Sequence, residues 1–179
     1  MELLDVTDKN GKLLGITKGR EQVHRDGDWH KVVHIWLVSD GKLLLQRRAA
    51  TKDIFPNLLD FSCNGHVRSG ESCEAAAARE MREELGIRIT KKDITPLGEK
   101  KISYKSKGVR INEIACIFLT AKKKAAEPRM QDGEVWGTGF YPIADVKSFL
   151  KEKPERFIPF QRYMLETIAG IEKILKAKR

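Results

Sequence analysis

Three glutamates, Glu80, Glu83 and Glu84, are the residues of this chain most suited to chemistry. On a helix, positions i, i+3 and i+4 share one face, so the three carboxylates would lie together. Like charges at that spacing repel one another and destabilise an isolated helix. A hard divalent cation neutralises such a cluster, and Mg²⁺ prefers carboxylate oxygens together with water and substrate phosphate. The spacing therefore predicts a metal site that handles a phosphate-containing substrate.

Glycine and arginine residues around the glutamates strengthen this interpretation. Gly65 allows the backbone to approach a ligand closely, so its carbonyl oxygen is a candidate metal ligand. Arg79 precedes Glu83 by four residues and can hold that carboxylate in place. Glu71 comes just before the helix, where a carboxylate favours the positive end of the helix dipole. For Glu71 a structural role and a metal contact both stay open.

The stretch 65–87 fits the pattern G-x5-E-x7-R-E-x-x-E-E-x-G-hydrophobic at every position, and it resembles the Nudix box. The resemblance implies an α+β fold, a Nudix α/β/α sandwich with a mixed central sheet, formed by one domain over 1–179. It implies Mg²⁺ or Mn²⁺ as the cofactor and attack of water on a diphosphate phosphorus. On this resemblance Glu83 and Glu84 are catalytic, and which of them is the general base stays open. The implied metal ligands are Gly65, Glu80, Glu83 and Glu84.

Most of residues 24 to 146 resembles a narrower branch, isopentenyl-diphosphate isomerase and its hydrolase relatives. The matching stretches are His30-Lys-Val-Val-His-Ile-Trp36, Gly41-Lys-Leu-Leu-Leu-Gln-Arg-Arg48-Ala, Phe55-Pro56 and Ile111-Asn-Glu113-Ile-Ala-Cys-Ile-Phe118.

This second resemblance adds candidate site residues outside the box. His66 and Glu113 match catalytic positions, and we expect Glu113 to be a metal ligand or the base. His30 matches a metal-binding histidine and His24 is a doubtful second, although either ring can be purely structural. We assign His30 and His66 to substrate binding and leave a further metal site open. The positions that would grip the diphosphate are Arg48 and Lys52, which can equally be exposed cations.

Two differences favour hydrolysis over isomerisation. Asn64 occupies the position of the isomerase cysteine, and an amide cannot replace the acid–base chemistry of a thiol. Cys63 is one residue away, and on a strand that shift turns its side chain to the opposite face. The chain also keeps Glu80 and Glu83, where the isomerase departs from the box.

The elements that must position these residues follow from local patterns. An N-terminal hairpin is expected over about 1–24 around Asn10-Gly11, and a second over 32–46 around Asp40-Gly41. Short runs predict a strand at 58–63, paired strands at 94–105 and 110–120, a strand at 133–141 and a helix at 143–151. The box helix should begin at Ser72 and end at Gly86, with Arg79, Gly70 and Gly86 as structural support. Helical spacing of apolar residues predicts a terminal helix over about 157–177.

Composition limits the remaining functions. The net charge is +9, but no basic strand rich in aromatic residues is present, so nucleic acid is an unlikely partner and a small diphosphate is favoured. No apolar run reaches the roughly 20 residues that cross a bilayer, and the N-terminus does not resemble a signal peptide. Three cysteines fit neither a zinc pattern nor a disulfide framework, so the cytoplasm is expected.

The sequence thus predicts a Mg²⁺- or Mn²⁺-dependent Nudix hydrolase acting on a diphosphate. The alternatives are an isopentenyl-diphosphate isomerase with an altered proton donor and a nucleotide-sensing module without turnover. An RNA-decapping activity would rest on the positive charge alone. Neither the substrate nor the oligomeric state, a homodimer included, follows from the residues.

Overall fold

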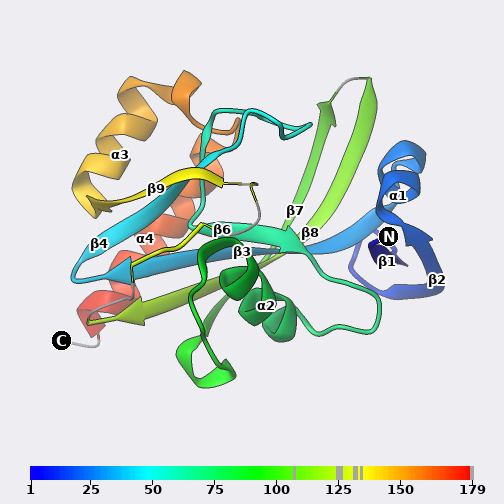
Figure 1. The fold of residues 1–179 in the computed structure, drawn as a ribbon, viewed down its shortest axis with the longest axis horizontal. Helices are drawn as coiled ribbons and strands as arrows, with labels where there is room; N and C mark the ends of the chain where they lie inside the picture. Colours follow the sequence, from blue (N-terminus) through cyan, green and yellow to red (C-terminus); the bar gives the residue numbers. More distant parts are fainter. Residues whose placement is uncertain (107, 124–126, 131–132, 134, 178–179) are drawn as a thin grey trace.

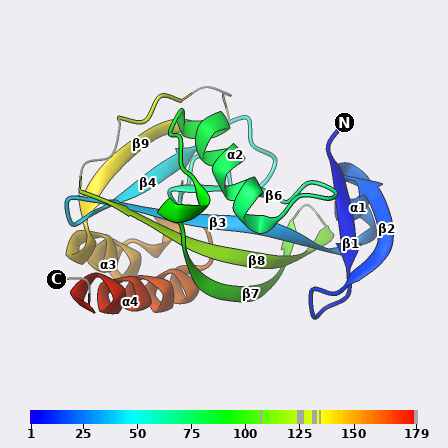
Figure 2. The ribbon, with the colours of Figure 1, turned by 90° about the horizontal axis from the view of Figure 1, so that it is seen from below.

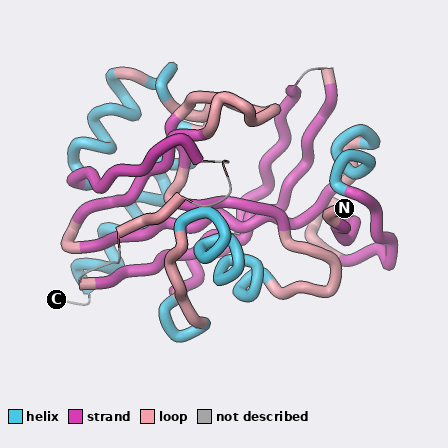
Figure 3. Tube along the Cα trace, in the orientation of Figure 1, coloured by secondary structure: helices cyan, strands magenta, loops and turns pink. Residues whose placement is uncertain are grey.

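A computed structural model describes residues 1–179 except 107, 124–126, 131–132, 134 and 178–179. The strands form a nine-stranded sheet with helices on both faces (Figure 1, Figure 3). In chain order the elements are β1 (Leu3–Thr7), β2 (Leu13–Gly19), α1 (Arg20–Asp26), β3 (Trp29–Ser39), β4 (Lys42–Arg48), β5 (Leu59–Asp60), β6 (Cys63–His66), α2 (Cys73–Leu85), β7 (Thr95–Ser106), β8 (Val109–Lys122), β9 (Val135–Pro142), α3 (Ile143–Glu152) and α4 (Gln161–Ala177).

Strand β3 organises the sheet because four other strands pair with it. It pairs antiparallel with β1, β4 and β6, and parallel with β8 over the register from Trp29↔Asn112 to Ser39↔Lys122. One parallel pairing among antiparallel ones makes the sheet mixed, as predicted. The tight turn from β3 to β4 places Asp40 and Gly41 at φ values of 48° and 71°, in the left-handed region that glycine tolerates best.

Alternation along β3 divides the core into two halves. Val33 and Ile35 belong to the cluster under α2, whereas Val32 and Trp36 belong to the cluster under α3 and α4. Figure 2 shows α2 on one side of the sheet and the pair α3 and α4 on the other. The predicted α/β/α sandwich is therefore confirmed.

Two expected elements differ in the structure. The single strand predicted over 58–63 is divided into β5 and β6, because Phe61 and Ser62 turn between them. The terminal helix begins at Gln161 rather than near 157, because Pro159 disfavours helical geometry in the residue before it. Residues 157 and 158 instead lie along β5, where the Ile158 amide donates to the carbonyl of Leu59 at 3.0 Å.

The expectation that the cysteines form no disulfide is wrong for two of the three. Cys73 is joined to Cys116 by a disulfide, whereas Cys63 is free and buried. The two partners are 43 residues apart, at the start of α2 and on β8, so only the fold brings them together. The argument for a reducing compartment from unpaired cysteines therefore no longer holds. Among the described helices, none is long and apolar enough to span a membrane.

Candidate active site

Helix α2 carries the three glutamates, and its two ends are fixed as predicted. The Ser72 hydroxyl accepts a hydrogen bond from the amide of Ala75 at 3.2 Å, and Gly86 ends the helix with a φ of 66°. Gly70, at φ 73°, makes the turn that leads into the helix. Ala77 and Met81 are fully buried against the sheet, so the face of α2 that bears the glutamates is held in one orientation.

Gly65 on β6 lies directly against the side chain of Glu80 on α2. A side chain at Gly65 would overlap the carboxylate of Glu80, so the absence of one is what admits that carboxylate. Glu80 and Glu84 are buried, at 8% and 4% exposure, while Glu83 is partly exposed. Burial raises the pKa of Glu80 to about 7, against the opposing charge of Arg79. A cation at this position would relieve the cost of burying the carboxylates.

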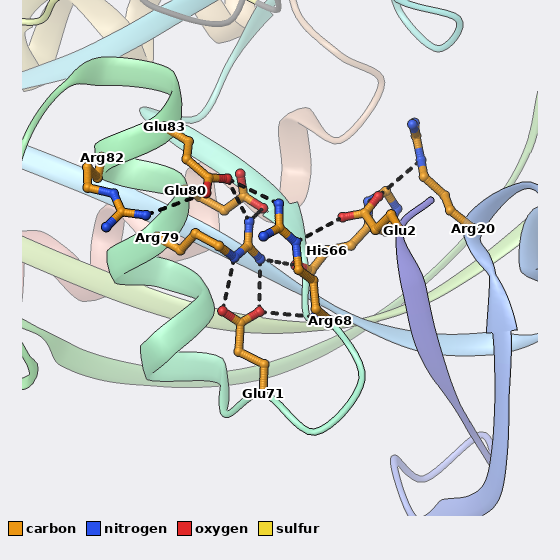
Figure 4. A network of polar contacts seen from close by, with 9 residues as sticks. All are labelled: Glu2, Arg20, His66, Arg68, Glu71, Arg79, Glu80, Arg82 and Glu83. Atoms are coloured by element: carbon orange, nitrogen blue, oxygen red, sulfur yellow. Dashed lines mark hydrogen bonds and ion pairs between the residues drawn. The ribbon is translucent and has the colours of Figure 1, made fainter.

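Arg79 holds the carboxylates in place (Figure 4). Its guanidinium donates to Glu80 at 2.6 Å and to Glu83 at 3.2 Å, and binds both oxygens of Glu71 at 3.0 and 2.9 Å. It also donates to the carbonyl of His66 at 2.8 Å, which ties α2 to the end of β6. The geometry of Glu71 favours the structural role, because both of its oxygens are bound to Arg79.

Arg68 is a site residue that sequence reasoning missed. Its guanidinium lies 3.2 Å from a carboxylate oxygen of Glu83 and 4.0 Å from one of Glu2, between α2 and the N-terminal segment (Figure 4). Arg68 stands at a variable position of the box pattern, and Glu2 is far from it in the chain. No spacing rule in the sequence could therefore have predicted that Arg68 lies near Glu2.

Three histidines gather beside the glutamates. His30 on β3 is buried, and the ring nitrogens of His24, His30 and His66 offer ligand atoms that all lie within 4.8 Å of one another. The strand register explains two of them, since Val32 pairs with His66 and His30 therefore lies one step along the same face of the sheet. His24, the doubtful second histidine, comes from α1, and its ring nitrogen is close enough to the others to belong to the group.

The three histidines have the protonation state that metal ligands require. Burial lowers the pKa of His24 and His30 to about 4 each and that of His66 well below its usual value, and repulsion from neighbouring histidines adds to the effect at His24 and His66. All three rings are therefore neutral at pH 7, the form that binds metals. The Nε2 atom of His30 is buried and has no hydrogen-bond partner among the described residues. An unsatisfied ring nitrogen in a histidine cluster fits a bound cation.

Glu113 stands next to this group. It is the register partner of His30 in the parallel pair of β3 and β8, so both side chains lie on one face of the sheet. Burial raises the pKa of Glu113 to about 7, and the Tyr104 hydroxyl donates to its Oε1 atom at 3.3 Å. A carboxyl group with this pKa can be a ligand or accept a proton at neutral pH.

A cavity of about 310 Å³ unites most of the predicted site residues. His30 and Arg79 are not among the described lining residues, but the ring centroid of His30 lies 5.2 and 5.3 Å from those of His24 and His66, which line the cavity. The predicted residues that line it are Arg48, Lys52, Gly65, His66, Glu80, Glu83, Glu84 and Glu113.

The guanidinium of Arg48 is engaged in hydrogen bonds within the cavity wall. Its guanidinium donates twice to the carbonyl of Ile54, at 3.0 and 2.8 Å, and once to Asp60 at 2.9 Å. The buried Asp60 also accepts a hydrogen bond from the Asn64 side chain at 2.7 Å. Asn64 lines the cavity, whereas Cys63 packs in the core under α2, as the one-residue shift predicts.

The sandwich with a glutamate-bearing helix at a polar cavity defines a site of the Nudix type. The NUDIX domain model matches residues 28–167, so this chain belongs to the Nudix family of hydrolases, which act on phosphorus-containing acid anhydrides.

Relatives by sequence include hydrolases and isomerases. A Nudix hydrolase of Clostridium acetobutylicum is 36% identical over 85% of this chain and 75% of its own length. An isopentenyl-diphosphate Δ-isomerase of Cereibacter sphaeroides is 30% identical over 87% of this chain and 86% of its own. Nudix hydrolase 3 of Arabidopsis thaliana is 30% identical over 89% of this chain, which spans only 22% of that protein.

Solved structures agree on the fold. The crystal structure of DR0079 from Deinococcus radiodurans is 26% identical, with a TM-score of 0.67 over 85% of this chain and 90% of its own. The Nudix domain of Shewanella oneidensis NrtR, solved with ADP ribose, has a TM-score of 0.53 at 18% identity, over 66% of this chain and 75% of its own.

Proposed function

We propose that this chain is a Mg²⁺- or Mn²⁺-dependent hydrolase that cleaves a diphosphate bond in a small anionic metabolite, nucleotide-derived or related. The observation that carries the proposal is the meeting of Glu80, Glu83 and Glu84 at one cavity beside Gly65. Carboxylate and carbonyl oxygens are the ligands that Mg²⁺ and Mn²⁺ prefer. When bound, such a cation screens phosphate charge and lowers the pKa of bound water.

The residues of the chain then divide the remaining work. Arg79 keeps Glu80 and Glu83 oriented, so the ligands need no reorganisation when a cation and a substrate arrive. Lys52 and Arg68 line the same cavity and supply positive charge for the phosphates. Glu113, with its pKa near 7, is suited to take a proton from the attacking water.

His24, His30 and His66 would form a second metal centre next to the carboxylates. Imidazole ligands suit Mn²⁺ and Zn²⁺ better than Mg²⁺, which prefers oxygen. The unpartnered Nε2 atom of His30 supports this reading over substrate binding by the rings. Two cations on neighbouring faces of one cavity are a recurrent arrangement in phosphate-cleaving enzymes.

Aromatic side chains also line the cavity, which bears on the group attached to the diphosphate. The rings of Phe55, Tyr104 and Phe160 contact one another, with centroids 5.3 to 5.8 Å apart. All three line the cavity. A substrate with charged phosphates at one end and a planar or apolar group at the other fits this division. Solved relatives of the fold include one bound to ADP ribose, so nucleotides belong in the first screen.

Exchange of single glutamates tests the proposal. Glu84→Gln or Glu83→Gln should abolish metal-dependent release of phosphate or monophosphate from a panel of diphosphates while leaving the fold intact by circular dichroism. Glu74→Gln, on the same helix but outside the cavity, is the matched control and should retain full activity. Unchanged turnover by either active-site variant would refute the proposal. Calorimetric binding of a nucleotide without turnover by the wild type would favour a sensing module.

An isomerase is the second candidate, because the histidine group and Glu113 are retained. It requires a proton donor in place of the thiol, and Asn64 engages Asp60 instead. Incubation with isopentenyl diphosphate separates the two reactions. The hydrolase releases phosphate, whereas the isomerase yields dimethylallyl diphosphate with no phosphate release.

A further inference from the structure

The disulfide between Cys73 and Cys116 joins the catalytic helix to the sheet. Cys73 is the first residue of α2, and Cys116 lies on β8, three residues after Glu113. Their Cα atoms are 6.3 Å apart, within the roughly 4.4 to 6.8 Å that a disulfide allows. The two thiols can therefore join or separate without a large movement of either element.

The bond is open to reagents from outside the active site. Both cysteines line a groove of about 540 Å³ on the α2 side of the sheet, together with Lys31, Glu99 and Phe118. Cys116 is 5% exposed, whereas Cys73 is only half-buried. The sulfur of Cys73 is therefore the accessible point of attack. Among the described residues, Arg68 is the one that this groove shares with the active-site cavity, so a reductant can reach the bond without entering that cavity.

We propose that Cys73 and Cys116 form a reversible thiol–disulfide site that sets how firmly the start of α2 is held. In reduction, a thiolate of a small dithiol attacks the sulfur of Cys73 and forms a mixed disulfide with it. The bond between Cys73 and Cys116 breaks, and Cys116 leaves as a thiolate that takes up a proton. The second thiol of the reagent then displaces Cys73 and becomes oxidised. The protein gains two electrons and two protons. A small-molecule disulfide reverses the change and is itself reduced to two thiols.

The position of the bond links it to the carboxylates. Glu71 and Ser72 immediately precede Cys73, and Glu71 binds the guanidinium of Arg79 through both oxygens. Arg79 in turn holds Glu80 and Glu83. The cross-link fixes the first turn of α2 against β8, so it limits how far Glu71 can move from Arg79. Reduction releases this restraint, and the metal ligands lose part of their orientation.

Thiol counting and thermal unfolding test the site without reference to activity. After incubation with glutathione disulfide, the denatured wild type should expose one reactive thiol, that of Cys63, and after reduction with dithiothreitol all three. Reduction should lower the unfolding temperature by roughly 5 to 10 °C. The Cys63→Ser variant should show the same shift. The Cys73→Ser variant should show none. Three reactive thiols in the oxidised protein, or an equal shift in Cys73→Ser, would overturn the proposal.

A metal titration tests the link to α2, and this step rests on the proposed function. Calorimetry should show Mn²⁺ binding several-fold more weakly to the reduced wild type than to the oxidised protein, with no such difference in Cys73→Ser. Equal Mn²⁺ affinity in both redox states would overturn the link. If neither state binds Mn²⁺, the proposed function fails, while the thiol count and the thermal shift still decide the redox site.

Discussion

The carboxylates of α2 line the cavity together with His24 and His66 of the histidine group, and the two groups are built in opposite ways. Glu80, Glu83 and Glu84 come from five consecutive residues of one helix, and arginines balance the charge of Glu80 and Glu83. The histidine group comes from α1, β3 and β6, and its members are neutral; His30 is buried, while His24 and His66 are partly exposed. Helical spacing brings the carboxylates together, whereas strand register and the position of α1 bring the histidines together.

The difference bears on what each group can bind. Oxygen ligands with flexible side chains suit hard cations such as Mg²⁺, and their charge must be offset when the site is empty. Buried neutral imidazoles need no counter-charge and favour cations that accept nitrogen ligands. Arginine pairs are present at Glu80 and Glu83, whereas the hydrogen bonds described for the histidine ring nitrogens involve no arginine, as this distinction requires. The two groups should therefore respond differently to metal exchange.

The largest expected effect comes from filling the space that admits Glu80. In Gly65→Ala the new methyl group would displace the Glu80 carboxylate, so we expect turnover to fall by about 100-fold or more. Steady-state kinetics with saturating Mg²⁺ measures the change. Gly137→Ala in β9, where an added methyl group meets no atom within 4 Å, is the matched control. Near-normal turnover in a folded Gly65→Ala protein would show that Glu80 is not a ligand.

The histidine group should be separable from the carboxylates by its choice of metal. In His30→Phe the buried ring is kept in volume but its free nitrogen is lost, so Mn²⁺ affinity at this centre should fall by roughly 10- to 100-fold. Calorimetry should show two Mn²⁺ sites in the wild type and one in the variant. In Glu84→Gln the histidine site should persist. Loss of both sites in a well-folded His30→Phe protein would contradict two separate centres.

The same contrast explains what could be predicted from the sequence. The box helix, its serine cap and its glycine stop depend on residues close together in the chain, and all three were predicted. Glu113 and His30 were named only through resemblance, because their pairing depends on the parallel register of β3 and β8. His24 was left doubtful because nothing in a short helix of seven residues shows where it will lie.

Contacts between distant segments were beyond sequence reasoning. The Cys73–Cys116 bond and the Arg68–Glu2 pair both depend on how loops and strands meet in three dimensions. The hydrogen-bond partners of Arg48 could not be predicted for the same reason. The resemblance names Arg48 for the diphosphate, but no resemblance indicates that its guanidinium also binds the Ile54 carbonyl and Asp60.

The smallest predicted effect distinguishes two arginines that touch the same carboxylate. Arg68 lies 3.2 Å and Arg82 lies 3.6 Å from Glu83, but only Arg68 lines the cavity. If Arg68 meets substrate phosphate, Arg68→Ala should raise KM by about 10-fold with little change in kcat, since a charge-assisted contact to phosphate is lost. Arg82→Ala should change KM by less than about 2-fold, because an exposed ion pair contributes little. Equal effects of the two substitutions would mean that Arg68 acts only on the charge of Glu83. In that case substrate phosphate would be bound by Lys52 and the metal centres. The arginines near Glu83 would then only balance the charge of the carboxylates, without contacting substrate.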